Sequence, residues 1–348
     1  MSQSHPRETL LARILAEHRE SPFSGLIEVR QEGQVILSQA FGFANLPERI
    51  LNTPQTRFGM ASGSKTFTAV AICRLVERGL VSFDTCLQEC LPEPLPGFDP
   101  GITLHHLLTH SSGVPDYFDE EESDDYEAVW NEHPAYNFRK PADFLPLFKD
   151  LPKKFKPGER FSYSNSGFIL LGLVIEHLTG KPFIHVIEDE VFKPAGMTRS
   201  GYFFQDQLPE GTALGYISQR EDEWRSNIYA IPIVGGADGG AFTTGDDLAN
   251  FWDSLLGSRL IRYEILNKML TPQLPTIPSR RRIYYGFGTW IGMNKGKPSV
   301  YYMLGEDPGV AFYSGYFNKS KVLFTLLGNT SEAAFRMLED LLPLIRNL

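Results

Sequence analysis

The sequence predicts an α/β (α+β) fold in which an antiparallel sheet is flanked by helices and carries a mostly helical inserted subdomain. Two strand-like runs near the start, 24–31 and 34–43, are joined by Glu32–Gly33, a strong hairpin turn signal. Four more runs near the end are separated by short turns, which is typical of an antiparallel sheet. These four runs span 283–293, 299–305, 310–317 and 321–329.

Helical patterns occupy the middle of the chain and both of its ends. Each range has apolar residues at helical spacing, and several begin at a capping residue or end at a glycine. The first range reads as an amphipathic surface helix, and the last is expected to cover one face of the sheet. The predicted helices are 1–20, the segment from Ser62 to Gly79, one that follows a Thr103 cap, 141–152, 164–180, 182–192, one capped by Thr244 or Asp246, and 331–348.

Composition excludes several classes of protein. The chain has 348 residues, of which 42% are hydrophobic, so it can bury a large core. A net charge of −9 and the lack of a basic stripe argue against a nucleic-acid partner. No apolar run is long enough to span a membrane, and the N-terminus lacks a signal-peptide core. We therefore expect a cytoplasmic protein without a membrane span, with an export signal that has been trimmed away as the alternative. The sequence leaves the oligomeric state open.

Metal and thiol chemistry are not indicated. The three cysteines, Cys73, Cys86 and Cys90, have no zinc spacing and no CxxC pair, so we expect them reduced and mostly packed. The histidines form no HExxH motif and the acidic run lacks an EF-hand pattern. Histidines 105, 106 and 110 lie on a helix beside a turn, where capping or packing is the favoured interpretation over catalysis. We expect no metal and no cofactor.

A dense acidic run covers Asp119–Glu127. Its like charges repel one another, which favours an exposed loop. Alternatively, the run lies at the rim of a cleft, where it would discourage anionic substrates and favour cationic ones.

The segment Phe58–Gly79 contains the main candidate for chemistry. Ser62 and Lys65 are three residues apart at the start of a helix, so they share one face. A partly buried lysine can become neutral and take the proton that a serine must lose to act as a nucleophile. The helix N-terminus adds a positive field where negative charge would develop. The alternative is a serine that only caps the helix, beside a solvated lysine.

A second candidate is Tyr163–Ser164–Asn165, at a loop-to-helix junction. A lysine ammonium near the Tyr163 phenol would stabilise tyrosinate and so provide a base near neutral pH. The Asn165 amide could hold a substrate carbonyl or orient the lysine. A packed tyrosine with an asparagine cap explains the motif equally well, and Tyr316–Asn318 also matches it.

A third candidate is the turn region from Leu304 to Gly309. Gly305 would allow a close approach to the backbone, and the N–H of Glu306 could share an oxyanion with the N–H of Ser62. An ordinary hairpin turn is the alternative for these residues taken alone.

Taken together and in this order, these segments resemble the serine β-lactamase and penicillin-binding-protein superfamily, most closely its class C branch with DD-peptidase and family VIII esterase relatives. The resemblance covers nearly the whole chain. It is carried by FGMASGSKTFTA, ITLHHLLTHSSGVPDY, FKPGERFSYSNSGFILLGLVIEHLTGKPF, GGADGGAFTTGDDLANF and MLGEDPGVAFYSGYF.

The resemblance implies a β-lactamase/transpeptidase-like fold and a serine hydrolase that needs no cofactor. Ser62 would attack a carbonyl while Lys65 and Tyr163 relay its proton, and Asn165 would contact the substrate. The N–H groups of Ser62 and Glu306 would form the oxyanion hole, and water would hydrolyse the acyl-enzyme. Residues 1–83 and 203–348 would form the sheet domain and 84–202 the helical subdomain, with the active site in the cleft between them.

The sequence departs from the family's pattern at Met303, where the third motif usually opens with Lys or His. A thioether cannot donate a charged hydrogen bond to a substrate carboxylate. We therefore expect a small ester, amide or peptide substrate that lacks this carboxylate, held near Asn165, Met303, Gly305 and Glu306. Glu306 could instead favour a substrate amine. The alternatives are a penicillin-binding DD-carboxypeptidase, a class C-like β-lactamase, or an inactive binding or scaffold homologue.

Overall fold

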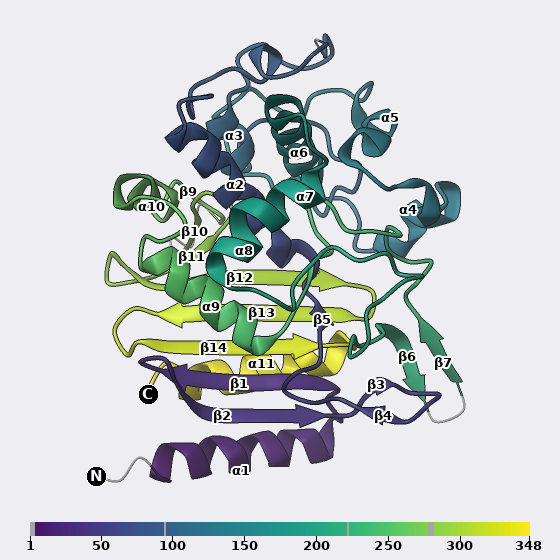
Figure 1. Cartoon of the computed structure of the whole chain (residues 1–348), viewed down its shortest axis with the longest axis vertical. Coiled ribbons are helices and arrows are strands. Elements are labelled where there is room, and N and C mark those ends of the chain that lie inside the picture. Colours follow the sequence, from purple (N-terminus) through teal and green to yellow (C-terminus); the bar gives the residue numbers. More distant parts are fainter. Residues whose placement is uncertain (1–3, 94, 221–222, 278–281) are drawn as a thin grey trace.

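An eight-stranded antiparallel sheet organises the part of the chain that the computed structural model describes, residues 4–93, 95–220, 223–277 and 282–348 (Figure 1). The strand order is β2-β1-β14-β13-β12-β11-β10-β9, so the first strand pairs with the last. The strands are β1 (Gly25–Gln31), β2 (Gln34–Phe41), β9 (Leu274–Pro275), β10 (Ile283–Tyr285), β11 (Trp290–Asn294), β12 (Lys297–Asp307), β13 (Val310–Phe317) and β14 (Val322–Gly328).

The predicted N-terminal hairpin is confirmed. Its turn residues Glu32 and Gly33 both have positive φ, 50° and 81°. A two-residue turn with this backbone matches the right-handed twist of the strands it joins. The hairpin therefore adds β1 and β2 to a sheet whose other strands come from the last quarter of the sequence (Figure 1).

The single strand predicted over 283–293 is wrong, because the chain forms two strands, β10 and β11, with a turn between them. Gly288 has φ +61° in this turn. A Cβ atom there would lie 2.6 Å from Cβ of Ala69 and 2.9 Å from the carbonyl oxygen of Lys65. The turn thus packs directly on the helix that begins at Lys65, which the strand-like aromatic pattern could not reveal.

Helices cover both faces of the sheet. On one face, α1 (Ser4–Glu20) and α11 (Glu332–Ile345) bury apolar residues such as Leu10, Ile14 and Leu341 against the strands. On the other face, a larger core contains α2 (Lys65–Glu77) and α9 (Gly245–Leu256). Thr244 caps α9, since its side chain accepts a hydrogen bond from the Asp247 N–H. The expected α/β arrangement is confirmed.

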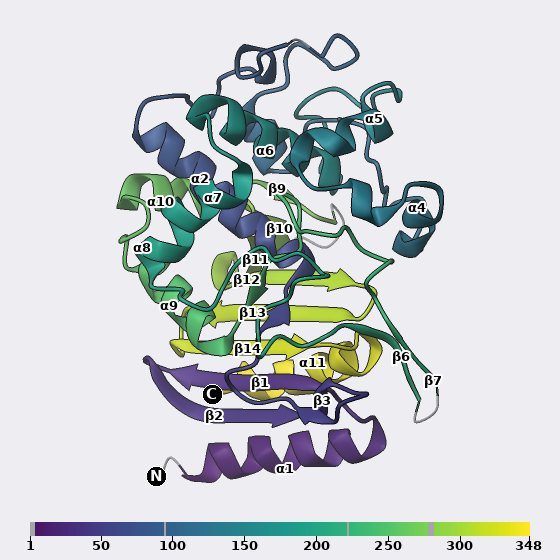
Figure 2. The same cartoon turned by 45° about the vertical axis from the view of Figure 1, so that its right-hand side comes forward.

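The middle of the chain is mostly helical and gathers beyond the β12 side of the sheet (Figures 1 and 2). The division into two subdomains at residues 83 and 202 stays a prediction. The remaining helices are α3 (Leu104–Leu108), α4 (Tyr126–Glu132), α5 (Leu145–Phe148), α6 (Asn165–Thr179), α7 (Phe183–Ile187), α8 (Lys193–Ala195) and α10 (Tyr263–Met269), and the short strands are β3 (Phe43–Asn45), β4 (Ile50–Leu51), β5 (Phe58–Gly59), β6 (Tyr216–Arg220), β7 (Glu223–Ser226) and β8 (Phe242–Thr243).

The predicted caps of α6 are present. Ser164 accepts a hydrogen bond from the Gly167 N–H at the start, and Gly180 ends the helix in a left-handed conformation, with φ 65°. The helix predicted over 141–152 is shorter than expected, a 3₁₀ turn over Pro141–Phe144 followed by α5. Pro146 lies in the first turn of α5. Because proline has no N–H, it cannot donate the α-helical hydrogen bond that would extend α5 towards the N-terminus.

The three cysteines are free thiols, and Cys73 and Cys90 are buried, as expected. No single helix within the described ranges has both the length and the apolar character that a membrane span requires. Only α6 together with residues 183–195 would have that length and apolar character, and this pair of helices is bent by 79°.

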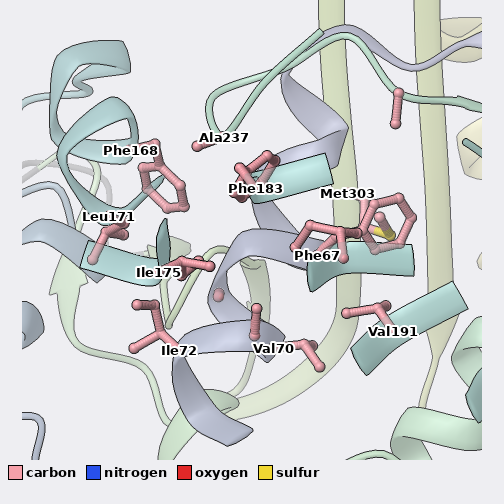
Figure 3. Packing of buried hydrophobic residues seen from close by; sticks show 14 of the residues in the cluster. Phe67, Val70, Ile72, Phe168, Leu171, Ile175, Phe183, Val191, Ala237 and Met303 are labelled. Atoms are coloured by element: carbon pink, nitrogen blue, oxygen red, sulfur yellow. The ribbon is translucent and has the colours of Figure 1, made fainter. Parts of the chain in front are cut away.

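The larger core joins α2 to the helices around it (Figure 3). Phe67 packs edge-to-face on Phe192 and Phe251, with ring centroids 5.1 and 4.9 Å apart. Its side chain is fully buried, so it anchors α2, the helix that begins at Lys65, among its neighbours.

We expect Phe67→Ala to lower the free energy of unfolding by about 3–5 kcal/mol, because it leaves a cavity among these rings. Urea denaturation followed by circular dichroism measures this change. Tyr263→Ala, at an exposed position, serves as the control and should cost less than about 0.5 kcal/mol. Equal effects of the two substitutions would contradict the prediction.

Candidate active site

Ser62 lies in a 3₁₀ turn, Ala61–Ser64, that continues directly into α2. The preceding residue, Ala61, is buried and has φ 43°, a conformation that non-glycine residues seldom adopt. Its carbonyl oxygen accepts hydrogen bonds from the Gly240 N–H, at 3.1 Å, and the Ser64 hydroxyl, at 2.9 Å. These bonds hold the turn in its strained form, which places Ser62 at the start of a buried helix.

Lys65 is 1% exposed, and its amine nitrogen is surrounded by oxygen atoms. It donates hydrogen bonds to Ser62 Oγ at 2.9 Å, Asn165 Oδ1 at 2.8 Å and the carbonyl oxygen of Asp238 at 2.6 Å. The structure thus rules out the solvated lysine of the alternative interpretation. The serine and the lysine meet as their spacing predicts.

Burial lowers the pKa of Lys65 from its ordinary value of 10.5, although the carboxyl groups of Asp238, Glu120, Asp116 and Asp307 act in the opposite direction. Loss of water around the ammonium therefore outweighs the attraction of four acids. A lysine of lowered pKa can lose its proton more readily, and its free lone pair then faces the Ser62 hydroxyl at hydrogen-bond distance.

Tyr163 also lies at this site, with the Lys65 nitrogen 4.8 Å from the centre of its ring. Burial raises the pKa of its hydroxyl well above the ordinary value, and a hydrogen bond with Ser62 only partly offsets this effect. The structure does not support the expectation of a readily formed tyrosinate, because burial of the phenol disfavours its charged form. Of the two groups, Lys65 is the one whose environment favours the unprotonated form.

Asn165 is the first residue of α6, and its amide oxygen orients the Lys65 amine. Asp116 in turn holds Asn165, since its carboxylate accepts hydrogen bonds from the N–H groups of Asn165, at 2.6 Å, and Ser166, at 3.0 Å. Burial raises the pKa of Asp116 to about 7. Sequence analysis missed Asp116, although it lies in the segment ITLHHLLTHSSGVPDY that carried the resemblance.

Gly305 brings β12 against the turn that holds Ser62. A Cβ atom at position 305 would lie 2.3 Å from the carbonyl oxygen of Met60 and 2.9 Å from the Ser62 nitrogen. Only glycine permits this approach, so the backbone of β12 at Gly305 and Glu306 runs beside the Ser62 N–H. The oxyanion hole formed by the N–H groups of Ser62 and Glu306 stays a prediction.

Met303 does not join the other predicted site residues. Its side chain is 1% exposed and packs in the larger core, and Figure 3 labels it among the residues of this cluster. It is not among the described residues that line the cavity beside Ser62. The expected contact between Met303 and substrate therefore has no support in the structure, because this side chain belongs to the core.

A cavity of about 610 Å³ opens at Ser62 and is lined by Tyr163, Asn165 and Glu306 among others. It contains no lysine or arginine among its described lining residues, whereas six acids besides Glu306 reach it. These are Glu120, Asp124, Asp125, Glu127, Asp238 and Asp307. The acidic run thus lies at the cavity, as its less favoured interpretation predicts.

The remaining candidates have structural roles. His106 completes the cap of α3 at Thr103, and His105 packs on Phe287 with ring centroids 5.5 Å apart. His110 is buried, and its Nδ1 accepts a hydrogen bond from the Ser164 N–H.

The second Tyr-x-Asn match, Tyr316–Asn318, does not contribute to the site. Asn318 donates a hydrogen bond to the carbonyl oxygen of Pro298 and lies outside the cavity, so the match is accidental. The described residues contain no group of three or more potential metal ligands.

Known proteins are similar to this chain over most of its length. A family model described as Beta-lactamase matches residues 11–343. Penicillin-binding protein 4* of Bacillus subtilis (strain 168) is 28% identical over 299 residues, which are 82% of this chain and 63% of that protein. The chain thus spans less than two thirds of that relative.

Solved structures show the same fold. A penicillin-binding protein from Bacillus halodurans is 44% identical with a TM-score of 0.89, and the match covers 95% of this chain and 99% of that one. A D-stereospecific amidohydrolase from Streptomyces sp. is 22% identical with a TM-score of 0.79, covering 98% of each chain, which is a likeness of fold.

We expect Lys65→Arg to slow acylation of Ser62 by at least about a hundredfold, because a guanidinium stays protonated and cannot act as a base. In the unaltered protein, kcat/KM for a neutral ester should rise with pH as Lys65 loses its proton. Since burial lowers the pKa of Lys65, this rise should be centred below pH 10.5. A variant that keeps the normal rate, or a rise centred at or above pH 10.5, would contradict this assignment.

We expect Gly305→Ala to lower kcat by about a hundredfold or more, because a methyl group would push β12 away from the Ser62 N–H. Steady-state hydrolysis of a neutral ester measures the effect. Met303→Leu, on the same strand but in the core, should change kcat by less than about threefold and serves as the control. If the two variants lose activity equally, the proximity of β12 to Ser62 is not the cause.

Proposed function

This chain belongs to the Beta-lactamase family, and we propose from that premise that it is a serine hydrolase that cleaves an ester or amide through an acyl-Ser62 intermediate. The observation that carries the proposal is the 2.9 Å distance between Ser62 Oγ and the buried amine of Lys65. A hydroxyl, a desolvated amine and an open cavity are the parts that nucleophilic catalysis needs.

In the proposed mechanism the neutral Lys65 amine accepts the Ser62 proton while Oγ forms a bond to the substrate carbonyl carbon. The carbonyl oxygen becomes an oxyanion between the N–H groups of Ser62 and Glu306. Collapse of this intermediate breaks the bond to the leaving group, which receives the proton from the Lys65 ammonium, directly or through the Tyr163 hydroxyl. Water then attacks the acyl carbon while the Lys65 amine accepts its proton. Collapse of this second intermediate breaks the bond to Ser62 Oγ, which takes the proton back from Lys65.

The substrate we propose is a small ester, amide or peptide without a carboxylate near the scissile bond. Support comes from the cavity, whose described lining contains seven acids and no lysine or arginine. An anionic group would be repelled there and would lack a charged hydrogen-bond donor, which is worth about 1.5–3 kcal/mol. This corresponds to about a tenfold to hundredfold loss in affinity.

A penicillin-binding protein is the second candidate, favoured by the relatives that carry this description, one of them 44% identical over 95% of this chain. A β-lactam would acylate Ser62 by the same chemistry. Its carboxylate is the group that the acidic lining would disfavour.

Intact-mass spectrometry after exposure to a fluorophosphonate and, separately, to a labelled penicillin separates these functions. We expect the fluorophosphonate to add one adduct that is absent from Ser62→Ala, because the hydroxyl is activated by Lys65. We expect penicillin to label at least about ten times more slowly, because its carboxylate meets the acidic lining.

Faster labelling by penicillin than by fluorophosphonate would favour the penicillin-binding protein. Failure of both reagents to modify Ser62 would contradict the hydrolase and favour an inactive binding or scaffold protein. Thermal unfolding of Ser62→Ala at the normal temperature would show that loss of the adduct is not loss of the fold.

A further inference from the structure

The acids of the acidic run and of the cavity differ in whether a cation neutralises them. Within the acidic run, Asp119 pairs with Lys154, Glu121 with Arg160 and Glu127 with Arg225. These ion pairs compensate three of the charges. The described residues provide no such ion pair for Glu120, Glu306 or Asp307, all of which line the cavity.

The lysine of the catalytic site cannot neutralise these acids. All three donor directions of Lys65 are used by Ser62, Asn165 and the carbonyl oxygen of Asp238. Glu120, Glu306 and Asp307 therefore share a cavity in which no described lysine or arginine is available to them.

Among these acids, Asp307 is the one whose position on β12 best indicates where a ligand would bind. It follows Gly305 by two residues on β12, so both residues are directed to the same face of the strand, the face that meets the Ser62 turn. The structure gives its carboxyl group neither a hydrogen-bond donor nor an ion pair among the described residues. Burial raises its pKa to about 8, and Asp238, Glu120 and Glu306 act in the same direction against the opposing charge of Lys65.

Asp307 is only partly exposed, and ionising an unpaired carboxyl group in such a place is costly unless a cation meets it. A substrate ammonium would be such a cation. It would also need to be close to the scissile carbonyl, because Asp307 is adjacent in sequence to Glu306, whose N–H faces the carbonyl oxygen in the proposed function. One residue of a strand spans only about 3.4 Å.

We propose that Asp307, assisted by Glu120 and Glu306, selects substrates that carry an ammonium group on the acyl part, one to three bonds from the scissile carbonyl, as in aminoacyl esters and amides. The inference rests on the proposed function and specifies its substrate class. Asp307 is a specificity-determining residue in this assignment, since it binds the ammonium and takes no part in proton transfer.

The test compares three p-nitroanilides of alanine, each in both configurations, with a free amino group, an N-acetyl group or an N-succinyl group. We expect kcat/KM to be at least about ten times higher for the free amine than for the N-acetyl substrate, and lowest for the anionic N-succinyl substrate. Asp307→Asn keeps the size of the side chain and removes its charge. It should lower the ratio of free amine to N-acetyl by about tenfold or more.

Two further variants keep the test independent of the folding of Asp307→Asn. Glu120→Gln, on a different segment, should lower the same ratio by about threefold or more. Glu122→Gln is the matched control, because this exposed residue belongs to the same acidic run but does not line the cavity. It should leave the ratio unchanged.

An N-acetyl or N-succinyl substrate hydrolysed as well as the free amine would overturn the inference. So would ratios unaffected by both Asp307→Asn and Glu120→Gln, or no hydrolysis of any of the three compounds by a protein whose Ser62 still reacts with the fluorophosphonate. Loss of that reaction in the unaltered protein would instead mean that the proposed function itself has failed.

Discussion

The site depends on one interaction, the burial of the Lys65 amine among three oxygen atoms. The hydroxyl of Ser62, the amide of Asn165 and the carbonyl of Asp238 come from three separate parts of the chain and meet at this nitrogen. Because an ammonium in such a place has lost its water, the neutral amine becomes accessible. Everything that holds these three oxygens in place therefore acts on the reactivity of Ser62.

The surrounding structure meets this requirement by close backbone contact. The left-handed conformation of Ala61 is maintained by hydrogen bonds to its carbonyl oxygen, and Gly305 lets β12 approach the Ser62 nitrogen. Asp116 fixes the start of α6 and with it Asn165. A rigid turn, a strand and a helix thus converge before any substrate arrives, which is the preorganisation that electrostatic catalysis needs.

The charge of the cavity sets a second constraint. Acids surround the lysine, yet its pKa is lowered, so desolvation outweighs their attraction. Burial likewise raises the pKa of Asp307 to about 8, and the neighbouring acids add to this rise. A cationic substrate would offset the negative charge of the acids around Lys65 and that of Asp307. An anionic substrate would add to the repulsion among them.

The sequence by itself determined the local elements and the most reactive pair. Hairpin turn residues, helix caps and apolar spacing depend on neighbours along the chain, and Ser62 and Lys65 meet because three residues make nearly one helical turn. Only the tertiary structure decided what depends on distant contacts. It divided the strand predicted over 283–293, buried Met303 in the core, raised the pKa of the Tyr163 phenol and turned the acidic run towards the cavity. Burial and pKa follow from packing between remote segments, and no local pattern encodes them.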